Sequence, residues 1–306
     1  MRGARRRQPQ SDPFMLLLFL SQLWNQIERL PVKPIVTLAV IGVMVAAHVE
    51  PALIPMLNQS PETLCLSSQG ITWSAQHGDM VTVILRVFGS ILIHGSDHHM
   101  YYNVSSFLWK GTQLETALGP GPFGVLLVAL VVIAAGLFVV TGPVIQPMLS
   151  SFAPATDCAY GFSIVLFALK YYIYNSQQGD VRLNFMFGIG FSVAAQYATW
   201  VELLIVHYIS PHTSFFGHLC GIGAGAVAAH THFVPVHYIW MMIESAIAGA
   251  GPPPPPAARP PPAAATARYT YTAQATGTRG ETEAQRRARL DEARNRRWQR
   301  MGDDID

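Results

Sequence analysis

Charged side chains are scarce in this sequence. Asp, Glu, Lys and Arg make up 12% of the 306 residues, and hydrophobic residues make up 50%. Soluble domains carry about 25% charged residues. So few charges exclude an ordinary soluble globule and indicate a membrane protein. The net charge of +2 hides two basic ends, since arginines cluster within residues 2–7 and again within residues 286–300.

Cysteines are also few. Cys65, Cys158 and Cys220 form no CxxC pair, and three cysteines are too few for a disulfide framework or a zinc site. We expect them to be packing residues, with one half of a disulfide as the alternative for Cys65. The zinc-binding helix motif HExxH is absent, so the sequence disfavours a metal centre and implies no cofactor.

The sequence does contain apolar runs. A helix needs about 20 apolar residues to cross the roughly 30 Å of hydrocarbon in a bilayer, and fewer when neighbouring helices shield its polar ends. These runs predict an all-α membrane protein, in which a six-transmembrane-helix bundle precedes a disordered, partly helical cytosolic tail. The six predicted spans are residues 34–49, 98–114, 123–140, 160–174, 196–209 and 215–233.

The segments outside these spans differ in composition. Residues 1–33 predict a cytosolic N-terminus and an interfacial helix, because their apolar stretch is short and no cleavage site follows it. The membrane core then covers residues 34–233, and residues 234–250 predict a second interfacial helix. We expect a Pro/Ala-rich linker at 251–280 and an Arg-rich helix at 281–306.

Basic residues outside the two ends indicate the orientation, because they gather on the cytosolic side of membrane proteins. The connections after the second and fourth predicted spans lie on the same side of the membrane as the chain ends. These connections contain or adjoin Lys110, Lys170 and Arg182. We therefore predict that both termini are cytosolic. The opposite loops hold one basic residue, Arg86, and are residues 50–97, 141–157 and 210–214.

Polar side chains recur at one level of the predicted bundle. The second, fourth and sixth spans all enter from the non-cytosolic side, and each has polar residues near that entrance. Polar groups within spans are costly, so they mark a functional site or a partnered cluster. The alternative for any one of them is a helix–helix hydrogen bond. The residues are His94, His98, His99, Asn103, Ser163 and His218.

This set contains the groups needed for nucleophilic catalysis. A serine becomes a nucleophile when a histidine takes its proton, and Ser163 and His218 fit these roles. Attack on a carbonyl also needs donors for the oxyanion. His99 and Asn103 lie four residues apart on one helix face and supply such donors. No carboxylate lies at this level in the fourth or sixth span, so the sequence predicts a Ser–His dyad.

Three motifs in this region resemble those of the rhomboid intramembrane serine proteases. They read HxxxxHxxxN from His94, GxS at residues 161–163, and HxxGxxxG from His218 through Gly221 and Gly225. The GxxxG portion has a bare surface that lets a neighbouring backbone approach closely. The order of the motifs and the predicted spans also agree with that family, most of all with its endoplasmic-reticulum branch.

The resemblance implies an activity and a location. Ser163 would be the nucleophile, His218 the general base, and His99 and Asn103 the oxyanion donors of an enzyme that cleaves membrane-anchored proteins. The location would be the endoplasmic reticulum membrane, in the service of protein degradation. Ile164 stands where the family usually has a second glycine. A branched residue there supports the alternative of a client-binding pseudoprotease. A transporter is disfavoured because no internal repeat is present.

The Arg-rich tail resembles a partner-binding motif of the same branch. The residues Arg286, Arg287, Arg289 and Leu290 match a motif that recruits the valosin-containing AAA ATPase. Charge alone also fits anionic lipid or RNA. The expected partners are membrane-protein substrates, that ATPase and the lipid bilayer, without nucleic acid.

Glu202 is a further ionisable residue within the apolar core, in the fifth predicted span. No nucleophile lies near it in the sequence. We expect a partnered structural carboxylate, with a substrate contact as the alternative.

Overall fold

The computed structural model describes residues 13–149, 158–177, 179–184, 190–210, 213–230 and 236–247. The chain divides into two units, Met1–Ala267 and Arg268–Asp306, and every described residue belongs to the first. The predicted linker at 251–280 and the Arg-rich segment at 281–306 lie outside the described residues. The same holds for the tail motif of Arg286, Arg287, Arg289 and Leu290.

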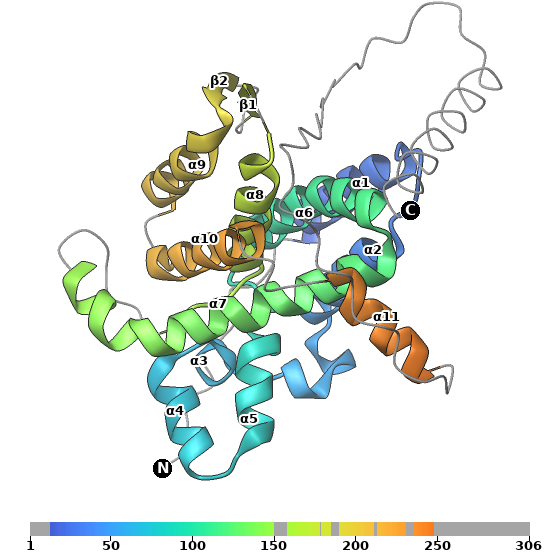
Figure 1. Cartoon of the computed structure of the whole chain (residues 1–306). Helices are drawn as coiled ribbons and strands as arrows, with labels where there is room; N and C mark the ends of the chain where they lie inside the picture. Colours follow the sequence, from blue (N-terminus) through green and yellow to red (C-terminus); the bar gives the residue numbers. More distant parts are fainter. Residues whose placement is uncertain are drawn as a thin grey trace, which may run out of the picture. The chain divides into compact units, whose positions relative to one another are not determined.

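Helices form most of the described structure (Figure 1). Two short 3₁₀ turns, η1 (Pro51–Leu53) and η2 (Pro55–Leu57), and a π-helical turn, η3 (Leu85–Gly89), lie in the long connection between α2 (Ile35–Val49) and α6 (Asp97–Leu118). The α-helices are α1 (Pro13–Glu28), α2 (Ile35–Val49), α3 (Pro61–Leu64), α4 (Ser68–Gln76), α5 (Met80–Ile84), α6 (Asp97–Leu118), α7 (Pro120–Leu149), α8 (Ser163–Asn175), α9 (Ala195–Ile209), α10 (Phe215–His230) and α11 (Val236–Ile247).

Each of the six apolar stretches singled out in the sequence forms a helix, namely α2, α6, α7, α8, α9 and α10. By length and apolar composition alone, one helix of the described residues, Pro120–Leu149, qualifies as a membrane span. The others are shorter or carry more polar residues. The all-α membrane class therefore agrees with the helical structure, whereas the count of six spans stays a prediction.

A two-stranded hairpin departs from the all-α prediction. Strand β1 (Asp180–Asn184) pairs antiparallel with β2 (Gly190–Ala194), with Val181 opposite Val193. The sequences DVRLN and GFSVA alternate polar and apolar or β-branched residues, which is the pattern of a short strand. Five residues are too few to be recognised against the surrounding helical periodicity.

Helix α8 lies inside the bundle. Its side chains from Ile164 to Lys170 are all buried, because α6, α7, α9 and α10 pack around it. A helix that is buried on every side has to be apolar on every side, as the segment IVLFAL is. Figure 1 shows α7 running between α8 and α10 on one side and the short helix α4 on the other, and α7 contacts all three.

Two glycines of α10 allow its close contact with α8. A methyl group at Gly221 would lie 2.2 Å from the carbonyl oxygen of Ile164, and one at Gly225 would lie 2.4 Å from that of Ala168. Real Cβ atoms do not approach so closely, so the two backbones touch only because both residues lack side chains. The close helix contact predicted from the GxxxG motif is confirmed.

The carboxylate of Glu115, near the end of α6, caps the start of α2. It accepts hydrogen bonds from the backbone N–H groups of Val36 at 2.9 Å and Thr37 at 2.8 Å, and from the Thr37 hydroxyl at 2.8 Å. A negative charge at a helix N-terminus satisfies unpaired donors and interacts favourably with the helix dipole. This cap fixes α2 beside α6, the helix that carries His99 and Asn103.

The two helices predicted to be interfacial both pack on the bundle. The ring of Phe19 on α1 stacks on Tyr101 of α6, with centroids 4.5 Å apart, and the Tyr101 hydroxyl donates to Gln22 at 2.7 Å. On α11 the indole of Trp240 lies against Gly121 of α7, where a methyl group would come within 2.2 Å of the ring. The placement of these helices at a membrane surface stays a prediction.

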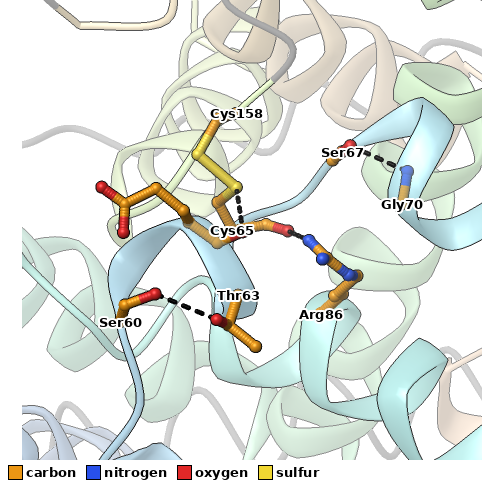
Figure 2. The surroundings of a disulfide bond; sticks show 8 residues. Ser60, Thr63, Cys65, Ser67, Gly70, Arg86 and Cys158 are labelled. Atoms are coloured by element: carbon orange, nitrogen blue, oxygen red, sulfur yellow. Dashed lines mark hydrogen bonds between the residues drawn. A yellow bond between two sulfur atoms is a disulfide. The ribbon is translucent and has the colours of Figure 1, made fainter. Parts of the chain in front are cut away.

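A disulfide joins Cys65 to Cys158 (Figure 2). Their Cα atoms are 5.2 Å apart, within the usual range for such a bond. The prediction that Cys158 only fills space was therefore wrong, and the disulfide alternative for Cys65 was right. The two residues are 93 positions apart in the sequence, so only the fold brings them together. Cys220 is free and buried, as expected of a packing residue.

Candidate active site

Ser163 is the first residue of α8, at the end of a turn that contains Gly161. Gly161, two residues earlier, has a φ of +105°, a conformation that residues with a side chain rarely adopt. A methyl group at Gly161 would lie 2.6 Å from Cε1 and 2.8 Å from Nε2 of His99. The glycine therefore lets the chain turn into α8 while the His99 ring lies directly against it.

The Ser163 hydroxyl is hydrogen-bonded to His218 on α10. The distance from Ser163 Oγ to His218 Nε2 is 2.9 Å, and the histidine is 2% exposed. The ring of Phe167, one helical turn after Ser163, lies 4.6 Å from the His218 ring and tilts by 34°. The aromatic contact holds the imidazole plane, and the α8–α10 glycine contact sets its distance from the serine.

The second nitrogen of His218 has no carboxylate beside it. Nδ1 is buried and has no hydrogen-bond partner within the described part of the chain. When Nε2 accepts the serine proton, the neutral ring carries its own hydrogen on Nδ1. Among the described residues, Ser163 and His218 thus form a pair without a third side chain hydrogen-bonded to the histidine.

His99 and Asn103 direct unpaired donors at the turn before Ser163. His99 Nε2 and Asn103 Nδ2 are both buried and have no partner among the described residues. A methyl group at Gly161 would lie 3.7 Å from Asn103 Nδ2, so both groups border the same small volume. Buried polar groups are nearly always paired, and an exception calls for a ligand or a functional explanation. Two such donors side by side suit an oxyanion.

The other two histidines of the predicted cluster take different positions. His94 Nε2 accepts a hydrogen bond from the backbone N–H of Phe162 at 3.4 Å, so it supports the turn itself. His98 faces α1, with its ring 5.2 Å from that of Phe19. The inclusion of His98 in the cluster was therefore wrong, because neighbouring residues on a helix point about 100° apart.

Sequence reasoning missed one pair near the site. His48 Nε2 and Asp97 Oδ1 are 2.7 Å apart and join the end of α2 to the first turn of α6. A signal was available, since His48 ends one apolar run and Asp97 begins the next, at the same predicted membrane level. The pair braces the helix turn that precedes His99.

Ile164 does not crowd the contact between α8 and α10. Gly221 faces the carbonyl oxygen of Ile164, while the Ile164 side chain is 6% exposed and belongs to the main hydrophobic core. The branched side chain is accommodated there without displacing His218 from Ser163. The branched side chain of Ile164 therefore gives no geometric reason to expect an inactive site.

Glu202 lies apart from the serine. It forms a buried ion pair with Lys170 and accepts a hydrogen bond from the Tyr174 hydroxyl at 3.1 Å. Lys170 is seven residues along α8 from Ser163, or about 10 Å at the rise of a helix. The prediction of a partnered structural carboxylate is confirmed. Within the described ranges no three His, Cys, Asp or Glu side chains are grouped closely enough to hold a metal ion.

Comparison with known proteins assigns the sequence of this chain to a family. The sequence model of the Rhomboid domain matches residues 82–234. This chain belongs to the rhomboid family. The matched region of this rhomboid contains every residue of the candidate site, from His94 to His218, whereas Cys65 precedes it.

Several curated relatives align with this rhomboid over a large part of its length. Rhomboid-related protein 4 of Mus musculus is 34% identical over 210 residues, which is 69% of this chain and 61% of that protein. Rhomboid-related protein 4 of Homo sapiens is 38% identical over 143 residues, covering 46% and 43%. Rhomboid-like protein 14, mitochondrial, of Arabidopsis thaliana is 34% identical over 203 residues, covering 65% and 56%.

The chain thus aligns with about half of the length of these relatives, from 43% to 61%. No solved structure matches it.

Proposed function

We propose that this rhomboid is an intramembrane serine protease that cleaves membrane-anchored proteins with a Ser163–His218 dyad. The observation that carries the proposal is the 2.9 Å contact between Ser163 Oγ and His218 Nε2, which is within reach of direct proton transfer. The absence of crowding by Ile164 supports an active enzyme over a pseudoprotease.

In the first half of the reaction, Ser163 Oγ attacks the carbonyl carbon of the scissile peptide while His218 Nε2 takes the hydroxyl proton. The carbonyl oxygen becomes an oxyanion and accepts hydrogen bonds from His99 Nε2–H and Asn103 Nδ2–H. When the tetrahedral intermediate collapses, His218 gives its proton to the departing amine. The products of this half-reaction are an ester on Ser163 and the released C-terminal fragment.

In the second half, water attacks the ester carbonyl and His218 again takes a proton. The same donors hold the second oxyanion, and collapse returns the proton to Ser163 and frees the carboxylate of the N-terminal fragment. In each half-reaction His218 acts first as base and then as acid, and the Phe167 ring contact positions it for both.

The partner and location proposals rest on the sequence alone. We propose an endoplasmic reticulum membrane location and recruitment of the valosin-containing AAA ATPase through Arg286, Arg287, Arg289 and Leu290. Cleaved clients would then pass to that ATPase for degradation. Charge reversal of the three arginines should abolish co-purification of the ATPase and leave substrate cleavage intact, whereas unchanged co-purification would rule the motif out.

The Cys65–Cys158 disulfide supports the proposed orientation. Both cysteines lie on or beside loops assigned to the non-cytosolic face, and disulfides persist in oxidising compartments such as the secretory lumen. A cytosolic location of these loops would make the bond unstable.

The test of the protease proposal is the purified full chain in liposomes with a labelled single-span membrane substrate. Fragments should accumulate with the native protein and disappear with Ser163→Ala, which removes only the nucleophilic oxygen. Binding of the uncut substrate by Ser163→Ala serves as the control for folding. Equal fragment yield from both proteins would exclude Ser163 as the nucleophile, and no fragments from either protein would leave client binding as the function.

A further inference from the structure

The segment from Cys158 to Phe162 is tied to the long α2–α6 connection at four points. Leu66 and Ala159 exchange both backbone hydrogen bonds of an antiparallel bridge, at 2.8 and 2.9 Å. The Gly161 N–H donates to the carbonyl of Ser90 at 2.8 Å. The third tie is the His94 contact with the Phe162 N–H, and the fourth is the disulfide. The turn that precedes Ser163 is therefore positioned by this connection.

The disulfide is the only covalent tie among the four, and neighbouring residues fix the position of Cys65. Arg86 Nη1 donates to the carbonyl oxygen of Cys65 at 2.8 Å, and the guanidinium lies under Gly70, where a methyl group would come within 2.7 Å of Cζ (Figure 2). Ser67 caps α4 by accepting from the Gly70 N–H at 2.9 Å. These contacts give Cys65 a fixed position from which the bond reaches Cys158.

The disulfide is five residues from the nucleophile along the chain. Between them lie Gly161, whose backbone borders His99 and Asn103, and Phe162, the residue before α8. Movement of this short stretch changes the distance from the proposed oxyanion volume to its two donors. Catalytic groups tolerate little displacement, since about 1 Å costs roughly 100-fold in rate.

We propose that Cys65 and Cys158 are positioning residues that make the protease redox-dependent: the disulfide holds the Gly161 turn in register with the oxyanion donors, and its reduction lowers turnover. This inference rests on the proposed function. Nothing in the proposed catalytic chemistry requires a disulfide, because neither sulfur takes part in the proton transfers or in the bond exchange at Ser163.

The switching step is ordinary thiol–disulfide exchange with a dithiol reductant. A reductant thiolate attacks the sulfur of the half-buried Cys158, the S–S bond breaks, and Cys65 leaves as a thiolate that takes up a proton. The second thiol of the reductant then attacks the mixed disulfide and releases Cys158. The protein gains two electrons and two protons, and the reductant is oxidised to its own disulfide.

The first experiment uses the full chain in liposomes with the labelled substrate, before and after treatment with dithiothreitol. Mass spectrometry of alkylated peptides reports the state of the Cys65–Cys158 bond. Reduction should lower kcat by about tenfold and change KM by less than about twofold, because displaced oxyanion donors affect the transition state more than substrate binding. The double variant Cys65→Ser, Cys158→Ser should have the low kcat from the start and no response to dithiothreitol.

Two outcomes of this experiment would overturn the proposal. One is an unchanged kcat when mass spectrometry shows full reduction, even if the unfolding temperature falls, because the bond would then only stabilise the fold. The other is a double variant that responds to dithiothreitol as the native protein does. Because reduction is applied to folded native protein, a double variant that fails to fold does not affect the first result.

A second readout needs no turnover and separates this proposal from the protease proposal. Hydrogen exchange at the amides of Ala159 and Gly161 should be slow in the oxidised protein and faster after reduction, as the bridge and the Ser90 contact loosen. Unchanged protection would refute the positioning role while leaving the dyad intact. Equal cleavage by Ser163→Ala and native protein would refute the dyad, and the exchange data would still test the disulfide.

Discussion

Replacing Gly161 with alanine places a methyl group in the proposed oxyanion site. The new Cβ would lie 2.6 Å from His99 Cε1, while carbon atoms in contact are separated by about 3.5 Å, so the ring has to withdraw by about 1 Å. A displacement of that size costs roughly 100-fold in rate. The φ of +105° adds a backbone cost of about 1–3 kcal/mol to folding. We expect kcat to fall by about 100-fold.

The assay measures kcat and KM with the labelled single-span substrate, together with the unfolding temperature in detergent. Gly136→Ala is the matched control, since nothing lies within 4 Å of a methyl group at this position of α7. The control should keep its kcat and be as stable as the native protein or more so. A Gly161→Ala protein that is folded and retains kcat within about twofold would refute the assignment of this volume to the oxyanion, because the expected loss is roughly 100-fold.

Three further sets of substitutions test separate parts of the structure. Asn103→Ala should lower kcat by about 100-fold with little change in KM, as measured by fragment release, because it removes one oxyanion donor; a pure KM effect would contradict that role. Glu115→Ala should lower the free energy of unfolding by about 3 kcal/mol, since two N–H groups of α2 lose their acceptor, while Glu115→Gln should lose less in the same denaturation assay. Glu202→Leu should lower the free energy of unfolding by about 3–5 kcal/mol, because it leaves the Lys170 charge buried without a partner, and adding Lys170→Met should restore most of that loss. Additive losses in a double-mutant cycle would disprove the ion pair.

The helical stretches and the contact between Ser163 and His218 were predictable from local patterns. Each predicted span coincides with a helix to within a few residues, except that α7 extends to Leu149 and α6 to Leu118. Ser163 and His218 were identified because the predicted topology places them at one membrane level. The spacing of Gly221 and Gly225 then indicated the contact that brings them together.

The failures have different causes, and the first is that pairs distant in sequence leave no periodic signal. Cys158 pairs with Cys65 across 93 residues, and nothing near either cysteine indicates its partner. His98 shares its membrane level with His99 and yet faces α1, because a shared level does not fix the direction of a side chain. The β1–β2 hairpin is shorter than the window over which a pattern can be recognised.

The sequence by itself determined the membrane class, the positions of the main helices and the residue types of the site, because apolar runs and motif spacings are local properties. Only the tertiary structure decided the distances: the 2.9 Å between Ser163 and His218, the polar nitrogens that border Gly161, and the disulfide five residues before Ser163. Each of these depends on how helices pack through their glycines and side chains. Packing is a property of the whole bundle, which no single segment specifies.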